Sequence, residues 1–223
     1  MIVGLLDSGV GPGFEDRIEA ARAFRLAADG TVVEGPATAA RHGHGTAIAT
    51  VVAERAPAAR LLIAQIFGDR LVTTAAQAAA GLDWLVGRQA RIVNMSFGLG
   101  EDRAVLRAAC ETACAAGVIL LAASPARGAP VYPASYPGVL RITGDARCAP
   151  GEFSALATDQ ADFGACVLGP DGAPAGASIA VAYATAAVAR FLAGNGPSSQ
   201  QAVRDHLAEI AIYQGPENRT RDG

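Results

Sequence analysis

The stretch "IVGLLDSGV" (residues 2–10) decides which fold the sequence predicts. Its first five residues are apolar or glycine and show no alternation of polar and apolar side chains. Such a run is typical of a β-strand buried on both faces, as in a parallel sheet covered by helices. Asp7 follows this strand and opens a glycine-rich turn. In sheets of this kind, the loops at the carboxyl ends of the strands carry the functional groups.

The rest of the chain repeats this pattern of buried strands separated by helices. Four further apolar runs predict strands, at 61–67, 91–97, 118–123 and 139–143. Helical patterns occupy 45–54, 73–89, 103–116 (with Asp102 as the expected cap), 178–193 and 198–211. The alternation predicts an α/β fold of three layers, a mostly parallel twisted sheet with helices on both faces. We expect one domain over residues 1–211 and a flexible tail over 212–223.

The composition is that of a domain with a large buried core. Of the 223 residues, 51% are hydrophobic, and the formal net charge is −3. No basic cluster suggests a nucleic-acid partner, and we expect no apolar run to cross a membrane, because charges or glycines interrupt each one. No basic leader segment precedes the first strand. We therefore expect a cytoplasmic protein whose four cysteines, which match no CxxC spacing, are reduced.

Asp7 allows two interpretations when it is considered alone. The turn "GVGPGF" (9–14) could be a nucleotide-binding loop, but it lacks the third glycine of the GxGxxG pattern and no helical pattern begins directly after it. Asp7 could instead cap the turn as a structural residue, which aspartate does well.

The stretch "RHGHGTA" (41–47) holds two of the three histidines of the chain. A zinc site would need further ligands in tetrahedral arrangement, but the remaining histidine is His206, in a late helical pattern, and no cysteine or glutamate has a suitable spacing. A general base at the start of a helix, pressed close to other backbone, is a better use of the flanking glycines. His44 is the expected base, and His42 is expected beside the cleft or on the surface.

The stretch "GASIA" (176–180) begins a long helical pattern made largely of alanine. Ser178 could be the N-cap of this helix, a position that serine favours. It could also be a nucleophile, since a backbone N–H at a helix start points at a developing oxyanion.

Asp7, His44 and Ser178 follow one another in the order Asp–His–Ser, which is the order of subtilisin. With the motifs "DSGV" (7–10), "HGT" (44–46) and "GASIA", the chain resembles the subtilases, the subtilisin-like serine proteases. Three further segments resemble the family in register: "VNMSFG" (93–98), "GVILLAAS" (117–124) and "YPASYPGVLRITG" (132–144).

This resemblance implies a serine endopeptidase in which Ser178 is the nucleophile and His44 the general base. Asp7 would orient the imidazole. Ser96, Phe97 and Gly98 would line the cleft and pair with a peptide substrate bound as an extended strand. No metal or other cofactor is implied, because the family's calcium-binding loops have no counterpart in this sequence.

The chain departs from the family pattern where the oxyanion would be bound. The asparagine that donates to the oxyanion is replaced by Ala126, and the threonine before the nucleophile by Ala177. Loss of the asparagine donor alone costs roughly 2.7–4 kcal/mol, a figure measured in subtilisin itself. Arg127 could supply a guanidinium in its place, or could be an ordinary arginine of a surface loop. These departures keep a second function open, a peptide-binding scaffold that has lost turnover.

Within the subtilases, the chain most resembles the small members that act in the biogenesis of quinohemoprotein amine dehydrogenase. Its size and its altered "GASIA" box carry this resemblance. It implies one maturation task, removal of the leader peptide from the small cross-linked subunit in the cytoplasm. It also implies an association with the peptide-modifying radical enzyme that makes the cross-links.

Overall fold

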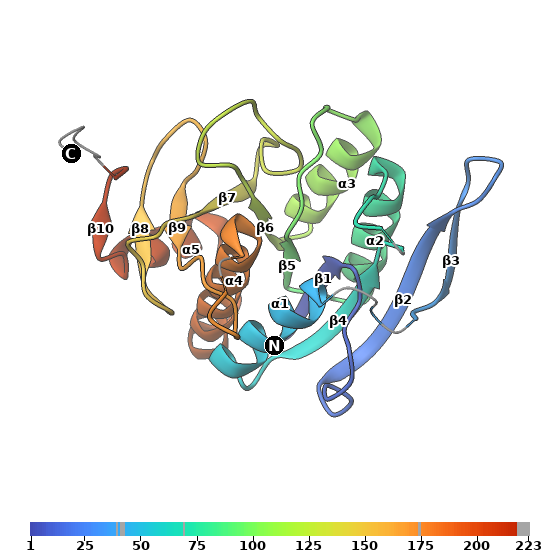
Figure 1. The fold of residues 1–223 in the computed structure, drawn as a ribbon, viewed down its shortest axis with the longest axis horizontal. Coiled ribbons are helices and arrows are strands. Elements are labelled where there is room, and N and C mark those ends of the chain that lie inside the picture. The colour runs from blue at the N-terminus through green and yellow to red at the C-terminus, as the bar shows by residue number, and fades with distance from the viewer. Residues whose placement is uncertain (39, 41–42, 69, 174, 218–223) are drawn as a thin grey trace.

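The computed structural model describes residues 1–38, 40, 43–68, 70–173 and 175–217. Its strands form one sheet with the order β10-β8-β9-β7-β6-β5-β1-β4-β2-β3 (Figure 1). Helices cover both faces of this sheet, which confirms the predicted three-layer α/β fold. The layers follow from the sequence, because strands that are apolar on both faces need a cover on each side.

The centre of the sheet consists of the five strands that the sequence predicts. They are adjacent and parallel, in the order β4 (Arg60–Gln65), β1 (Ile2–Asp7), β5 (Ile92–Met95), β6 (Ile119–Ala123) and β7 (Val139–Gly144). Asp7 therefore lies at the carboxyl edge of the sheet, next to the segment that follows β5. This edge is where a site is expected in an open parallel sheet.

The strands that the sequence does not predict lie at the two sides of the sheet: β2 (Ile18–Leu26), β3 (Val32–Pro36), β8 (Phe153–Ala155), β9 (Phe163–Ala165) and β10 (Tyr213–Gln214). They are very short or carry charged and exposed residues, so they lack the continuous apolar pattern. Strands β2 and β3 form an antiparallel hairpin that extends from one end of the molecule (Figure 1).

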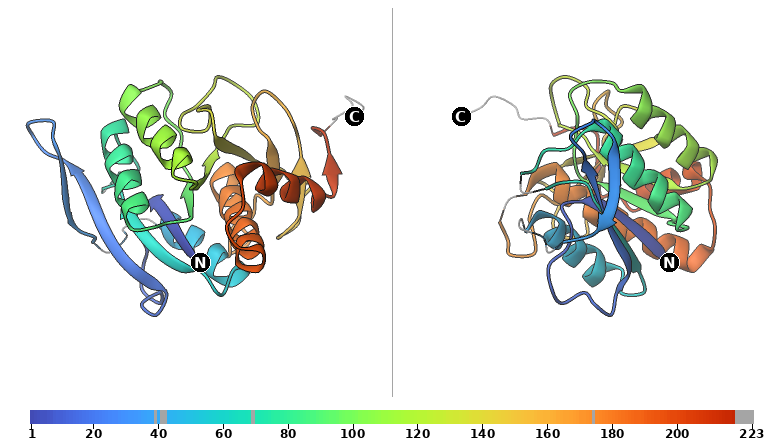
Figure 2. Two further views of the ribbon diagram at one scale, coloured as in Figure 1. Left: turned by 180° about the vertical axis from the view of Figure 1, so that it is seen from behind. Right: turned by 90° about the vertical axis from the view of Figure 1, so that its right-hand side faces the viewer.

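One helical layer contains α1 (His44–Arg55), α4 (Gly176–Asn195) and α5 (Gln200–Glu209), and the other contains α2 (Ala75–Gly87) and α3 (Ala104–Ala115) (Figure 2). Helix α4 is the centre of its layer, and its alanines let it lie close to its neighbours. Among the described residues, only α4 is long and apolar enough to cross a membrane, which the sequence analysis did not expect. Because 67% of its apolar window is buried inside the protein, α4 also fits the role of a core helix.

Two local predictions were wrong. Helix α3 has Arg103, not Asp102, as its N-cap residue, and the Asp102 carboxylate instead accepts a hydrogen bond from Arg107 Nε at 3.2 Å. The expected tail does not begin at residue 212, because Ile212 N–H donates to the Phe153 carbonyl and β10 pairs with β8. These backbone hydrogen bonds add a short parallel strand to the sheet, a pairing that no local pattern indicates. Residues 218–223 lie outside the described part.

Candidate active site

A buried carboxylate–imidazole pair lies at the carboxyl end of β1. Asp7 Oδ1 is 2.8 Å from His44 Nδ1 and also accepts a hydrogen bond from Ser8 N–H at 2.7 Å. Asp7 is only 1% exposed, whereas the His44 side chain keeps 30% of its surface accessible. With Nδ1–H donating to the carboxylate, Nε2 is left without a proton and can act as a base. The structure thus brings together two of the three residues that the sequence predicts for catalysis.

Glycine at position 45 allows helix α1 to approach the loop after β1. A Cβ atom added at Gly45 would lie 2.1 Å from the Gly9 carbonyl oxygen and 3.0 Å from Asp7 Oδ1. Gly45 N–H in turn lies 3.2 Å from Ser8 Oγ, which accepts its hydrogen bond. The predicted close approach at the start of this helix is confirmed for Gly45, whereas Gly43 has nothing within 4 Å of an added Cβ.

Two further side chains hold this loop, and neither was predicted from the sequence to have a role in the site. Gln65, buried at the end of β4, donates from Nε2 to the Ser8 carbonyl at 2.9 Å. Thr46 Oγ1 accepts a hydrogen bond from Gly11 N–H at 2.9 Å. The available signals were a glutamine inside an apolar strand and a threonine directly after "HG". Together these contacts fix Asp7 and His44 on rigid elements.

The hydrogen bond from His44 to Asp7 raises the pKa of His44 above its usual value. Burial of the ring acts in the opposite direction, and the negative charge of Asp7 adds to the increase. The second carboxylate oxygen, Asp7 Oδ2, is buried and has no hydrogen-bond partner among the described residues. The imidazole of His44 is therefore more basic than a free histidine, which suits a proton acceptor.

Ser178 lies in the first turn of helix α4, as its third residue. The N-cap residue is Ala175, so the alternative that Ser178 caps this helix was wrong. Gly176 has a φ of +64°, a backbone conformation that favours glycine, and the chain enters the helix through it. In the first turn of a helix the backbone N–H groups lack intrahelical acceptors, so the Ser178 N–H is available to bind an anion.

The Ser178 hydroxyl is hydrogen-bonded to the backbone in this structure. It donates to the Ser96 carbonyl at 3.1 Å, and no hydrogen bond joins it to His44 among the residues that the structure describes. Catalytic hydrogen bonds are often long or poorly aligned in structures without substrate and tighten only in the complex. The geometry therefore places Ser178 next to the segment after β5, with its hydroxyl directed to the backbone.

The predicted cleft residues Ser96, Phe97 and Gly98 follow β5 and share a pocket with His44. The backbone groups of Phe97 and Gly98 have no hydrogen-bond partners within the described ranges, so they are free to pair with an extended peptide. The pocket has a volume of about 360 Å³ and is lined mainly by apolar residues: Phe67, Leu71, Val72, Phe97 and Leu99, with His44, Thr73, Ser96 and Gly98.

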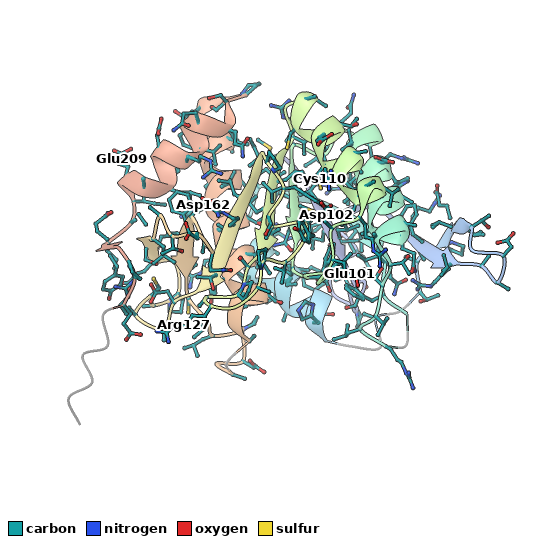
Figure 3. The ribbon with its side chains drawn as sticks, turned by 90° about the horizontal axis from the view of Figure 1, so that it is seen from above. Glu101, Asp102, Cys110, Arg127, Asp162 and Glu209 are labelled. Carbon is teal, nitrogen blue, oxygen red and sulfur yellow. The ribbon has the colours of Figure 1, made fainter. Side chains whose placement is uncertain are left out.

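Arg127 lies on a different side of the site. Its side chain is exposed (Figure 3) and lines a cavity of about 400 Å³ together with Ala126 and Gly144. A Cβ atom added at Gly144 would lie 3.4 Å from Ala177 N, so this cavity adjoins the backbone just before Ser178. The role of Arg127 at an oxyanion stays a prediction.

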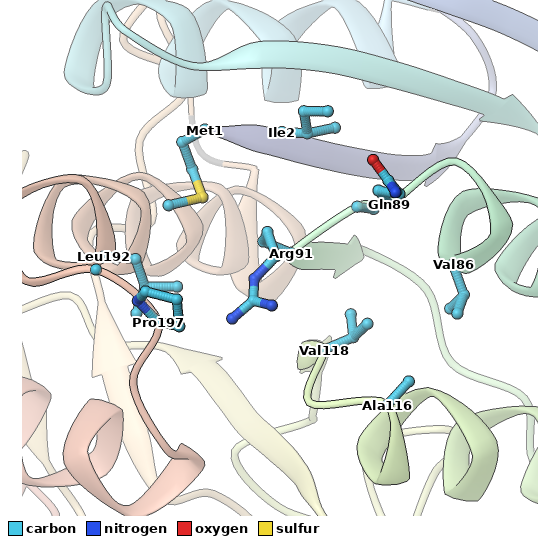
Figure 4. Close-up of a pocket in the computed structure, with 11 residues that line it drawn as sticks. Met1, Ile2, Val86, Gln89, Arg91, Ala116, Val118, Leu192 and Pro197 are labelled. Carbon is cyan, nitrogen blue, oxygen red and sulfur yellow. The ribbon is translucent and has the colours of Figure 1, made fainter.

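A cavity of about 600 Å³ lies elsewhere, lined by the amino ends of β1, β5 and β6 and the end of α4 (Figure 4). Its lining is mostly apolar around Arg91 and contains no nucleophile, so it is not the candidate active site. Among the described residues, no three histidine, cysteine, aspartate or glutamate side chains lie together in a way that could hold a metal ion. His42 lies outside the described residues.

The fold and the site together describe a class of protein. Its members are three-layer α/β proteins with a carboxylate–imidazole pair at the carboxyl edge of the sheet and a serine in the first turn of a central helix. Residues 1–163 match the model of the Subtilase family, and because this is well over half of the chain, the protein belongs to that family. Asp7, His44 and the segment 96–98 lie within the matched residues, and Ser178 lies beyond them.

Known proteases resemble this chain in sequence and in fold. The thermostable alkaline protease of Halalkalibacterium halodurans is 27% identical over 151 residues, which are 63% of this chain and 40% of that protein. Subtilisin Savinase of Lederbergia lenta is 28% identical over 151 residues, 63% of this chain and 54% of its own length. The chain thus spans less than two thirds of these relatives.

Solved structures agree on the fold. The S41 psychrophilic protease is 20% identical, with a TM-score of 0.72 over 96% of this chain and 85% of that chain. A cold-adapted subtilisin-like serine proteinase is 19% identical, with a TM-score of 0.70 over 99% of this chain and 84% of that chain. At such identities the likeness concerns the fold alone.

Proposed function

We propose that this subtilase is a serine endopeptidase in which Ser178 is the nucleophile, His44 the general base and Asp7 the group that orients the imidazole. The observation that carries the proposal is the 2.8 Å contact between His44 Nδ1 and Asp7 Oδ1, with the carboxylate buried. A buried carboxylate on Nδ1 leaves Nε2 as the proton acceptor and stabilises the imidazolium that forms. Membership of the subtilase family supports the same assignment.

In the proposed reaction an extended peptide pairs with the free backbone groups of Phe97 and Gly98. The Ser178 hydroxyl leaves the Ser96 carbonyl and turns to Nε2 of His44. Its oxygen attacks the scissile carbonyl carbon while its proton passes to Nε2, and the oxyanion is stabilised by the Ser178 N–H. His44 then gives this proton to the leaving amine. In the second half of the reaction His44 takes a proton from water, the water oxygen attacks the acyl carbon, and the proton passes back to the Ser178 oxygen as the acid is released.

The pocket beside His44 favours an apolar side chain in the substrate. Leu71 and Val72 are 50% and 69% exposed, and they line this pocket together with Phe67 and Phe97. An apolar side chain from the bound strand would cover these residues and gain about 25 cal/mol for each Å² of apolar surface removed from water.

The physiological task that we propose is removal of a leader peptide from the small cross-linked subunit of a quinohemoprotein amine dehydrogenase. The enzyme would act in the cytoplasm, in association with the radical enzyme that modifies the same peptide. What supports this is the replacement of two oxyanion contributors by Ala126 and Ala177, since a maturation enzyme needs few turnovers and must spare other proteins.

A peptide-binding scaffold without turnover is the second candidate. It is favoured by the same two alanines and by the hydrogen bond that directs the Ser178 hydroxyl to Ser96. A scaffold would use the free backbone of Phe97 and Gly98 and the apolar pocket in the same way, so binding alone does not separate the two functions.

Covalent labelling by a fluorophosphonate separates them, because the reagent needs an activated serine. We expect the wild type to be labelled at Ser178 and Ser178→Ala to be unlabelled. The control is Ser198→Ala, in the loop between α4 and α5, which should be labelled like the wild type. Incubation with a leader-bearing amine dehydrogenase subunit should then give cleavage by the wild type and by Ser198→Ala, and none by Ser178→Ala. An unlabelled wild type, or equal processing by Ser178→Ala, would refute the peptidase.

A further inference from the structure

A chain of buried polar side chains connects the middle of helix α4 to its first turn by way of β5. Thr185 Oγ1 is 3.1 Å from Asn94 Nδ2, and Asn94 Oδ1 is 2.8 Å from Ser96 Oγ. Ser96 Oγ is also 2.8 Å from the Ser178 carbonyl oxygen. Thr185 and Asn94 are fully buried, and Ser96 is 3% exposed. We propose that Asn94 and Thr185 are positioning residues that hold Ser178 through Ser96, an inference that rests on the proposed function.

The protons available on these side chains determine which group donates in each hydrogen bond between Thr185 and Ser178. The Ser96 hydroxyl has one proton but lies 2.8 Å from two oxygen atoms, Asn94 Oδ1 and the Ser178 carbonyl. A half-turn of the Asn94 amide about its Cβ–Cγ bond exchanges its oxygen and nitrogen with little change in shape. The Thr185 hydroxyl then donates to the amide oxygen, the amide N–H donates to Ser96 Oγ, and the hydroxyl proton of Ser96 goes to Ser178. Every contact in the chain then has one donor and one acceptor.

The surroundings of Asn94 and Thr185 show that packing alone does not account for them. Asn94 lies on β5 between β1 and β6, and Thr185 lies in a helix whose neighbouring positions are alanine and valine. Burying an amide and a hydroxyl in an apolar core is costly unless both are hydrogen-bonded, and apolar residues of similar size would fill the same space. A fully hydrogen-bonded row of polar side chains in this core therefore indicates that it orients the first turn of α4, which contains Ser178.

The two serines are joined in both directions. Ser96 Oγ contacts the Ser178 carbonyl, and Ser178 Oγ donates to the Ser96 carbonyl at 3.1 Å. The first turn of α4 is thereby fixed against the segment that continues into Phe97 and Gly98, the proposed site of the peptide strand. The nucleophile and the substrate backbone are then held in fixed positions relative to each other. A shift of about 1 Å between them can lower the rate about 10²-fold.

Saturable labelling by a fluorophosphonate tests the proposal, because it gives a maximal rate and a half-saturating concentration separately. For Thr185→Val, which keeps the size and removes the hydroxyl, we expect the maximal rate to fall about tenfold or more, with half-saturation changed by less than about twofold. Thr185→Ser restores the hydroxyl and should recover most of the rate. Tyr183→Phe is the matched control, since it removes a buried hydroxyl of the same helix that donates to the Leu168 carbonyl at 3.2 Å.

The outcomes separate this inference from the proposed function. If the wild type is not labelled, the peptidase itself fails. If the wild type is labelled and Thr185→Val is labelled equally fast, or if Tyr183→Phe loses as much rate as Thr185→Val, the positioning role is refuted. A rise in the half-saturating concentration without a fall in maximal rate would refute it as well. Should Thr185→Val not fold, Thr185→Ala, which has no β-branch in the helix, replaces it, with circular dichroism confirming the fold.

Discussion

The two sides of the active site differ in how much of the family pattern they keep. On one side, Asp7 and His44 are held by a short hydrogen bond, by the close approach of Gly45 and by the buried Gln65. On the other side, the start of α4 lies beyond the residues that match the family model, and alanine stands at the two positions, 126 and 177, where the resemblance predicts oxyanion contributors. The surroundings of the proposed base, His44, thus keep the family's pattern, and those of the proposed nucleophile, Ser178, do not.

This difference has a physical reason. A general base works only in one tautomer and one orientation, so few substitutions around Asp7 and His44 leave it intact. An oxyanion hole loses its donors one at a time, and each loss slows the reaction without changing its course. A peptidase with a complete base and a weakened oxyanion hole is slow and remains a peptidase. The following variants test that comparison.

The largest effect is expected for His44→Ala. Without the imidazole, Ser178 has no proton acceptor, and turnover should fall on the order of 10⁴–10⁶-fold, the upper figure being that of subtilisin in the same family. His206→Ala is the control, because His206, in α5, takes no part in the site. Its ring stacks on that of Phe191 in α4, with 4.3 Å between the ring centroids. His42→Ala should also keep most of its activity. Peptide cleavage rates with purified variants measure this, and a residual rate above about 1% in His44→Ala contradicts the assignment of the base.

Gly45→Ala should have the next largest effect. Its methyl group would overlap the Gly9 carbonyl oxygen, so α1 must move away from Asp7 and the hydrogen bond to His44 must lengthen. We expect a loss of activity of about 10²-fold and of about 1–3 kcal/mol in the free energy of unfolding. Gly43→Ala is the matched control two residues earlier, where φ is −69° and an added Cβ meets nothing within 4 Å.

Urea unfolding and cleavage rates of Gly45→Ala and Gly43→Ala are compared with the wild type. Equal behaviour of the two alanine variants would show that the close approach at residue 45 is not needed.

The sequence predicts the centre of the fold and the proximity of Asp7 and His44, for a physical reason. The central strands are largely apolar runs, and the motifs at Asp7 and His44 depend on short spacings along the sequence. The strands at both sides of the sheet are short or carry charged and exposed residues, and the Asn94–Thr185 contact joins segments far apart in the sequence. A single buried polar residue in an apolar run was the only signal of Gln65 and Asn94, and it does not name the partner.

The pH dependence sharpens the comparison on the base side. The hydrogen bond to Asp7 raises the pKa of His44, so the rate should increase with pH through a midpoint above 6.5, changing about tenfold per pH unit below it. Stability should change in the opposite direction. Because the folded pKa lies above the unfolded value, the interaction stabilises the protein fully below pH 6.5, and this contribution is lost as the pH rises through the folded pKa.

Labelling rates between pH 5 and 9 measure the first effect, and urea unfolding of the wild type and His44→Ala over the same range measures the second. A midpoint below 6.5 would mean that burial of the ring outweighs the hydrogen bond to Asp7.

The smallest effect concerns the other side, where Arg127 is the predicted substitute for the missing asparagine donor. Arg127 shares a cavity with Ala126 and Gly144, and Gly144 lies against the backbone that leads to Ser178. A guanidinium that reaches the oxyanion from an exposed loop is less well ordered than a buried amide, so Arg127→Ala should lower kcat about fivefold to tenfold, with KM unchanged. Arg88→Ala, an exposed arginine at the end of α2 that lies over Trp84, is the control. If Arg127→Ala keeps full activity, the Ser178 N–H is the one donor that this proposal leaves at the oxyanion, and the contrast between the two sides of the site is larger still.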